Sequence, residues 1–325
     1  MSFRFCGWLL AVFCCFPTTT RADFWLKPQL GTQLGTTDFD LQLEQEDATG
    51  DVKVRSLLEW PVDVWLAGLS AGTAFPSRKL EGTWVLEGRF DTSLGDARGK
   101  MVDRDWLSSR SENIPSTLFA KTESNTESFV ALGELSAGYR FHHRGDNERL
   151  TIDAHGGMRL EYFAMTALGA KGKYLDRNGD FQPVEIAGDI DAAVYKVVHV
   201  LPFVGSQLVL RPIPRLSFPL TARVHALLSY SHDDHVLRNK DAYGRAYGMG
   251  LSSSIASEYA VSGPLALGLY AEAYYLASLT GILKQEFYDD DPGTPTDERD
   301  SQVPDSDFAV KSVRLQLMVY ARLTF

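Results

Sequence analysis

Apolar and polar residues alternate with a period of two over long stretches of this chain. In the last stretch, SVRLQLMVYARLTF (312–325), every odd position from Val313 to Phe325 is apolar, and the even positions are mostly polar. A period of two is the repeat of a β-strand, whose successive side chains point to opposite faces. Fourteen residues are many for a strand of a soluble sandwich. Residues 312–325 are therefore predicted to form a long strand with one apolar and one polar face.

The same alternation recurs in about ten segments, separated by turns and loops of unequal length. The connections alternate between short turns, such as 74–79 and 262–264, and long loops, such as 93–125 and 168–189. This arrangement is typical of outer-membrane barrels, whose apolar face meets lipid. The predicted fold is all-β: a single antiparallel transmembrane β-barrel of about ten strands, with short periplasmic turns and long extracellular loops. The predicted strands are 25–45, 53–73, 80–92, 126–142, 149–167, 190–209, 216–233, 242–262, 265–285 and 307–325.

The N-terminal residues have the composition of an export signal. Arg4 precedes an apolar run (6–16) that is too short to cross a membrane, and the small residues Thr20 and Ala22 precede a predicted cleavage site before Asp23. All three cysteines lie in this segment, so the exported chain is expected to contain no disulfide. The predicted organisation is a signal peptide at 1–22 and an outer-membrane barrel at 23–325.

The charge of the chain limits its partners. The formal net charge is −10, and loss of the signal would remove two arginines and no acid. A strongly acidic chain is unsuited to binding nucleic acid or an anionic membrane surface through bulk charge, and it favours basic partners. We therefore expect no nucleic-acid partner.

Two polar motifs fall where the strand pattern predicts the outer end of the barrel. MVDRDW (101–106) places Asp103 and Asp105 two residues apart in a predicted loop, where such a pair is also common as a solvated turn. In SHDDH (231–235), Asp233 and His235 continue the odd, lumen-facing positions of the preceding strand, whereas His232 and Asp234 between and beside them have the opposite parity. An aspartate beside a histidine can orient the imidazole as a general base, and a carboxylate pair can help to hold a water.

These motifs resemble the two signature stretches of the omptin family, the outer-membrane aspartyl-type endoproteases of Gram-negative bacteria. LGT (34–36), LEW (58–60), YKVVHVLPFVG (195–205) and the terminal strand follow the family's order, so that the resemblance covers essentially all of the exported chain. It implies a ten-stranded barrel in the cell outer membrane with an active site at its extracellular rim.

The resemblance also implies roles for the motif residues. His235 would activate a water, Asp233 would orient His235, and Asp103 would position the water with Asp105 beside it. Polypeptides would be the substrates, and lipopolysaccharide is a candidate activator. The resemblance implies no cofactor, no metal and no covalent intermediate.

The sequence departs from the family in its substrate pocket and on its outer wall. Where the family has an acid at the base of a pocket for a basic side chain, this chain has Ser231, and Leu43 holds the place of a second acid with Glu44 beside it. Val198 stands where the family carries a lipopolysaccharide-binding arginine. Ser231 and Glu44 are therefore candidate pocket residues, and both the side chain preferred at the cut and the dependence on lipopolysaccharide are left open.

Two other functions fit the same pattern. One is a barrel without catalysis that acts as an adhesin, a pore or a structural protein. The other is a barrel lipid hydrolase, because Ser229 and Ser231 share the lumenal face with His235.

A lesser motif, DRNGDF (176–181), begins like a calcium loop but has no glycine at its sixth position, so an exposed Asn-Gly turn is predicted there.

Overall fold

The structure is a computed structural model. It describes residues 22–47, 50–77, 81–107, 117–141, 149–176, 178–235, 240–287 and 303–325. At 43–47, 50–52, 235, 240, 286–287 and 303–305 it describes the backbone alone. Residues 1–21 of the predicted signal peptide lie outside the described residues.

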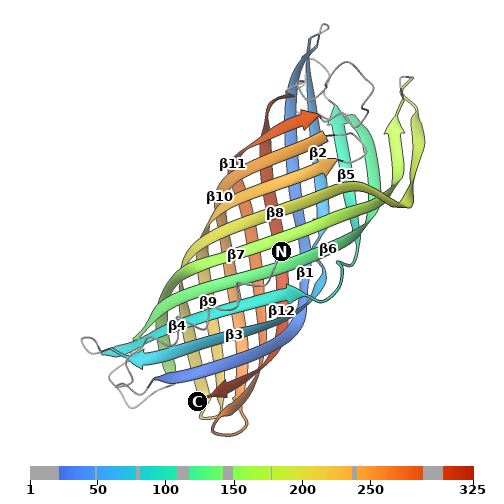
Figure 1. Ribbon diagram of the computed structural model, residues 1–325. Helices are drawn as coiled ribbons and strands as arrows, with labels where there is room; N and C mark the ends of the chain where they lie inside the picture. Colours follow the sequence, from blue (N-terminus) through green and yellow to red (C-terminus); the bar gives the residue numbers. More distant parts are fainter. Residues whose placement is uncertain are drawn as a thin grey trace.

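Twelve antiparallel strands form one continuous sheet (Figure 1). No helix among the described residues is long and apolar enough to cross a membrane. The single sheet of twelve strands confirms the predicted all-β fold. The strands are β1 (Asp23–Asp47), β2 (Gly50–Pro61), β3 (Val64–Pro76), β4 (Gly82–Ser93), β5 (Lys100–Leu107), β6 (Thr117–Phe141), β7 (Leu150–Leu175), β8 (Phe181–Ile213), β9 (Leu216–His235), β10 (Lys240–Ala260), β11 (Leu265–Phe287) and β12 (Val303–Thr324).

The sheet closes on itself because β1 pairs with β12. In the half of the barrel where β1 begins and β12 ends, the ring contains β1, β3, β4 and β6 to β12. In the opposite half, which we call the rim, β2 and β5 replace β3 and β4 between β1 and β6. Each ring has ten strands, as predicted. The structure has twelve strand segments because the strands are interrupted at residues 62–63 and again at 94–99.

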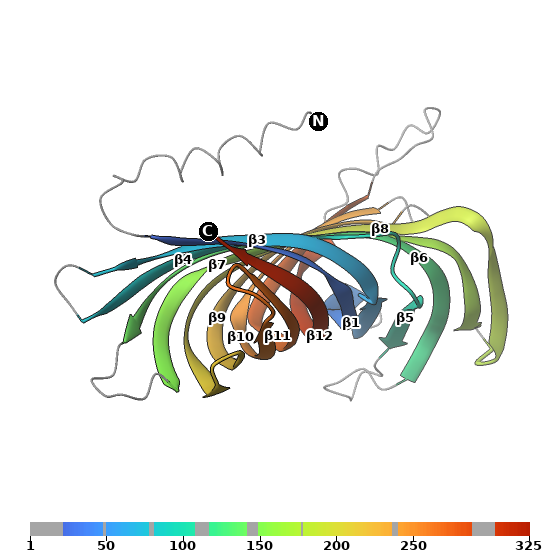
Figure 2. The same cartoon turned by 90° about the horizontal axis from the view of Figure 1, so that it is seen from below.

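Two predicted loops are largely strand. The segment 93–125 contains β5 and the first part of β6, so MVDRDW lies in a strand and the loop prediction there was wrong. The segment 168–189 is mostly a hairpin formed by the ends of β7 and β8. These yellow-green ends project beyond their neighbours in both Figure 1 and Figure 2. Strand pairing thus continues well beyond the part of the barrel that shows clear alternation.

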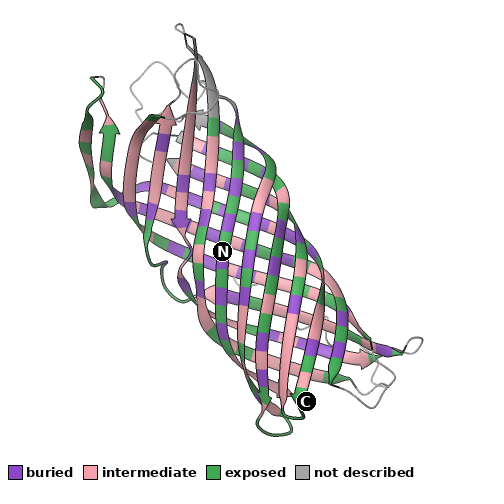
Figure 3. Ribbon diagram, turned by 180° about the vertical axis from the view of Figure 1, so that it is seen from behind, coloured by how far each residue is buried: buried purple, intermediate pink, exposed green. Residues whose placement is uncertain are grey.

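The two faces of the sheet differ in the way that the alternation predicts. In β12, Val313 and Val319 are about half exposed on the outside, whereas Arg314 and Gln316 are buried inside. Figure 3 shows the same alternation of buried and exposed positions along the other strands. A band of apolar side chains on the outside of a closed barrel is the surface that lipid covers, since every backbone group of the barrel is already paired within the sheet.

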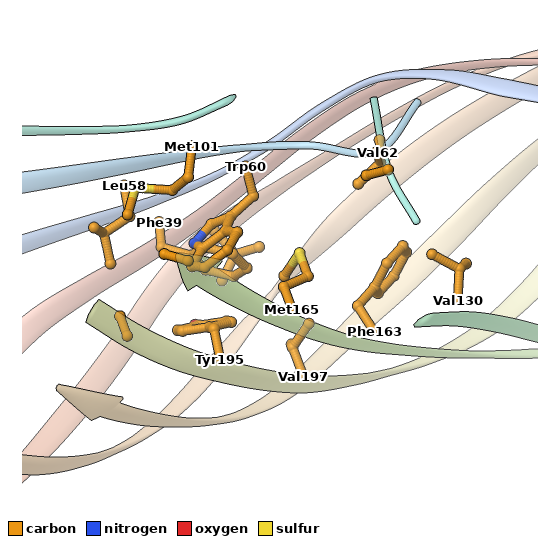
Figure 4. Close-up of a cluster of buried hydrophobic side chains, with 14 of the residues drawn as sticks. Phe39, Leu58, Trp60, Val62, Met101, Val130, Phe163, Met165, Tyr195 and Val197 are labelled. Atoms are coloured by element: carbon orange, nitrogen blue, oxygen red, sulfur yellow. The ribbon is translucent and has the colours of Figure 1, made fainter. Parts of the chain in front are cut away.

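Two layers of side chains lie within the lumen. The first, the charged layer, lies in the middle of the barrel and consists of Glu134, Arg159, Glu161, Arg223, Glu272 and Arg314. The guanidinium of Arg159 lies 2.8 Å from Glu161 and 3.0 Å from Glu272, and Arg314 lies 2.8 Å from Glu161. Buried charges are stable only when paired in this way. Nearer the rim, a layer of buried apolar side chains follows (Figure 4).

Candidate active site

β5 carries both residues of the predicted carboxylate pair on its lumenal face. Asp103 pairs in register with Leu58 of β2, which belongs to the buried apolar layer. Directly paired residues of antiparallel strands share a face of the sheet, so Asp103 also faces inward. Asp105, two residues on, shares that face and is only 5% exposed. The local sequence places two acids inside the rim because strand geometry, and not a turn, sets their directions.

A cavity of about 330 Å³ lies beside both carboxylates, and we call it the rim cavity. Asp103 and Asp105 line it from β5, and the remaining walls come from β2, β6, β7 and β8. Most of its other lining residues are apolar or small, among them Leu58, Met101 and Ala193. The carboxylate pair therefore borders a hollow large enough for a side chain.

β9 carries the second motif, and its parity is as predicted where the structure describes it. Asp233 is buried on the lumenal face together with Ser229 and Ser231. His232 lies on the outer face, where Nε2 is 2.8 Å from Oδ1 of Asp241 on β10. His235 is the last residue of β9, but its side chain is not among those described. The structure thus places Asp233 at the rim. The predicted interaction between Asp233 and the His235 imidazole lies outside the described side chains.

Four aromatic side chains lie in the apolar layer beneath this part of the rim, and we call them the aromatic floor: Phe39, Trp60, Tyr195 and Phe308. The ring of Tyr195 is 4.1 Å from that of Phe39 and 6.1 Å from that of Trp60, centroid to centroid. Three of these residues are labelled in Figure 4. In register, Tyr195 of β8 is directly opposite Asp233 of β9. The floor therefore contacts the candidate site and supports it from below.

The sequence interpretation did not single out this floor. Its only signal was parity: Phe39 and Tyr195 occupy lumen-facing positions, where most neighbours along a barrel strand are polar. An aromatic residue at such a position indicates packing inside the lumen, but the pattern does not identify its partners. Those partners come from strands that are far apart in sequence.

The candidate pocket residue Ser231 has aromatic and glycine neighbours. Gly244 of β10 is its register partner, and a Cβ at Gly244 would collide with the Ser231 hydroxyl and lie 2.7 Å from the Phe308 ring. The backbone of Glu44 lies in β1, but its side chain is not described. Ser231 thus lies in tightly packed surroundings that include the Phe308 ring, and position 231 contributes a hydroxyl to the site instead of a carboxylate.

The predicted Asn-Gly turn is present at the tip of the β7–β8 hairpin. The carboxylate of Asp176 accepts hydrogen bonds from the backbone N–H groups of Asn178 and Asp180, both at 2.9 Å, and from the Gln182 amide. These bonds lower the pKa of Asp176, the bond from Asp180 most of all. Among the described residues, no three histidine, cysteine, aspartate or glutamate side chains converge as metal ligands would. The carboxylate that began the calcium-like motif is engaged within its own turn.

Comparison with known proteins shows a likeness of fold. No protein-family model matches the sequence, and no characterised protein matches it at the level of sequence. The chain is similar to the crystal structure of the outer membrane protease OmpT from Escherichia coli, with a TM-score of 0.75 and 15% identity over 95% of this chain and 99% of that one. A Pseudomonas aeruginosa FadL homologue is matched over 93% of this chain and 90% of its own with a TM-score of 0.33 and 10% identity.

The first likeness confirms the omptin-like fold that the two motifs predicted. The chain shares the architecture of that barrel, and the match covers nearly the whole of both chains. At 15% identity this result concerns the fold, so activity has to be argued from the residues themselves.

Proposed function

We propose that this chain is an endopeptidase of the cell outer membrane, with its active site at the barrel rim facing the cell exterior. The observation that carries the proposal is that Asp103, Asp105 and Asp233 all face the lumen at one end of an omptin-like barrel. Asp103 and Asp105 line one cavity there, and acids gathered at a cavity are typical of catalytic sites.

The proposed mechanism is attack by a water on the carbonyl carbon of a peptide bond. His235 takes a proton from the water as the new C–O bond forms, and that proton then passes to the leaving amine as the C–N bond breaks. Asp233 orients the imidazole and stabilises its charged form. Asp103 holds the water, with Asp105 beside it. The protein forms no covalent bond with the substrate in this scheme.

Polypeptides are the proposed substrates, because the barrel is similar in fold to an outer membrane protease. The net charge of −10 favours approach of basic polypeptides over acidic ones. Lipopolysaccharide is a candidate activator, and its effect on the cleavage rate tests this role. Val198 is exposed on the outer face where the resemblance would have placed an arginine.

The pore alternative is disfavoured by the contents of the lumen. The aromatic floor and the charged layer fill successive levels inside the ring. An open channel needs a continuous polar path through these levels. A barrel serving only adhesion would need none of the inward acids at the rim.

The lipid-hydrolase alternative meets a problem of access. Ser229 of β9 is directly opposite His199 of β8, so a serine and a histidine do lie close together. Both are at most 1% exposed. A nucleophile at this depth cannot reach an ester in the membrane.

The test is cleavage of a diverse peptide library by the refolded full chain, with and without lipopolysaccharide. We expect cuts that vanish in His235→Ala, because loss of a general base lowers the rate by about 10²–10⁴-fold. Asp234→Ala is the matched control, since Asp234 is a neighbouring acid of opposite parity, and it should retain the cuts. Identical cutting by wild type and His235→Ala would contradict the proposal.

A further inference from the structure

The rim cavity has a structural origin in an irregularity of β7 and β8. Ala167 pairs with Ala193, but Leu168 pairs with Asp191 and Ala170 pairs with Ile186, so several residues of β8 bulge out of the ladder. Gly169 at this point has φ +60°, where a side chain would be strained. Irregularities of this kind redirect side chains and often lie next to active sites. Here the displaced hairpin leaves a hollow between itself and β5.

Small and apolar side chains form most of the cavity wall. Ala170 of β7 and Ala193 of β8 leave space, and Leu58, Met101 and Ile186 supply apolar surface. The cavity volume of about 330 Å³ is at the lower end of the range for ligand pockets, about 300–1,000 Å³. This size suits one side chain of a polypeptide better than a whole small molecule.

The charges around the cavity argue against an acidic occupant. The carboxylates of Asp103 and Asp105 stand along one wall and would repel an acidic side chain. Lys173 lines the cavity with its stem, but its ammonium lies 4.3 Å from the centroid of the Phe181 ring and so is directed to that ring. In the proposed mechanism the two carboxylates hold water, which leaves the apolar walls to select the side chain.

The cavity also lies at the right spacing from the second half of the candidate site. Ala193 lines the cavity, and Tyr195, two residues along the same strand, is opposite Asp233. Two residues of a strand span about 6.6 Å, which is also the spacing between side chains on one face of an extended peptide. A substrate whose scissile carbonyl lies between Asp103 and Asp233 would therefore bring a flanking side chain to the cavity.

We propose that the rim cavity is a specificity pocket that receives a medium-sized or large apolar side chain of the substrate, next to the bond that is cut. This inference rests on the proposed peptidase function and adds its substrate class: polypeptides with leucine-, methionine- or phenylalanine-like residues beside the cleavage site. Residues Ala170 and Ile186 set the depth of the pocket.

The experiment compares kcat/KM of the full chain for peptides that differ at one flanking position, with Ala, Leu, Phe, Arg or Glu there. We expect Leu and Phe to exceed Ala by at least about tenfold, the discrimination that a few buried methylenes give. Ala170→Leu should fill the pocket and abolish that preference. Ile186→Ala should enlarge it and shift the preference from Leu to Phe. These opposite shifts would not follow from a merely structural role.

Ala164→Leu is the matched control, because Ala164 is on the same strand with outward parity, and its preference should equal that of wild type. Ile186→Ala decides the question if Ala170→Leu does not fold. Cleavage with a preference for Arg, with no preference, or with the wild-type preference in both pocket variants would overturn the inference and leave the peptidase standing. Absence of cleavage by folded wild type at every peptide would overturn the proposed function itself, and the inference with it.

Discussion

The rings of Phe39 and Tyr195 are in contact across the lumen, with their centroids 4.1 Å apart. Their strands, β1 and β8, are five steps apart in either direction around the ten-stranded ring at the rim. Two side chains from opposite walls therefore meet, and Phe308 and Trp60 pack around them. This contact closes the barrel just beneath the candidate active site.

Closure of the lumen predicts that the barrel does not conduct ions. In planar lipid bilayers, the refolded protein should give no steady single-channel current at potentials where a porin of similar size conducts. The measurement is the current recorded from single insertion events. A stable conductance from wild-type protein would contradict the closed lumen and restore the pore alternative.

The charged layer predicts a large loss of stability when one of its members is removed. Arg159→Ala leaves Glu161 and Glu272 without a shared cation in a buried site, and such changes cost about 3–5 kcal/mol. The free energy of unfolding should fall accordingly in urea titrations of the protein in lipid vesicles. Lys171→Ala is the control: its ion pair with Glu185 is exposed on both sides, so no measurable change is expected. Equal effects of the two variants would refute the stabilising role given to the buried network.

The turn at Asp176 predicts a pH-dependent hairpin tip. Its carboxylate form accepts the hydrogen bonds of the turn, so its pKa in the folded protein lies below the ordinary value of 3.8. The stabilisation is therefore complete above pH 3.8 and is lost as the pH falls through the lower, folded-state pKa. The chemical shift of the Asp180 amide should titrate with a midpoint under 3.8, and Asp176→Asn should abolish the titration. A midpoint at or above 3.8 would show that these bonds do not favour the ionised form.

The strand pattern predicts the barrel well where strands cross lipid and poorly where they rise above it. In β12, apolar Val313 to Val319 alternate with polar residues because one face meets lipid and the other meets the charged lumen. In β5, outward Val102 and Arg104 alternate with inward Asp103 and Asp105, so neither face is uniformly apolar. A polar strand of this kind resembles a loop in sequence, which is why 93–125 was predicted as one.

The candidate site shows the same division. The inward direction of Asp233 follows from parity along β9 and could be predicted. The rim cavity depends on bulges that change parity within β7 and β8, and no local pattern marks them. The aromatic floor depends on contacts between residues such as Phe39 and Phe308, which become neighbours only when the sheet closes.

The most direct test of the peptidase account compares two aspartates on neighbouring strands and opposite faces. Asp233 faces the lumen on β9, whereas Asp241 of β10 faces outward and is 2.8 Å from His232. We would measure kcat/KM for Asp233→Asn and Asp241→Asn on the best peptide of the library, with folding checked for both. The account predicts a loss of at least about 10²-fold for Asp233→Asn, through loss of the oriented base, and wild-type activity for Asp241→Asn. Wild-type activity of Asp233→Asn would contradict it.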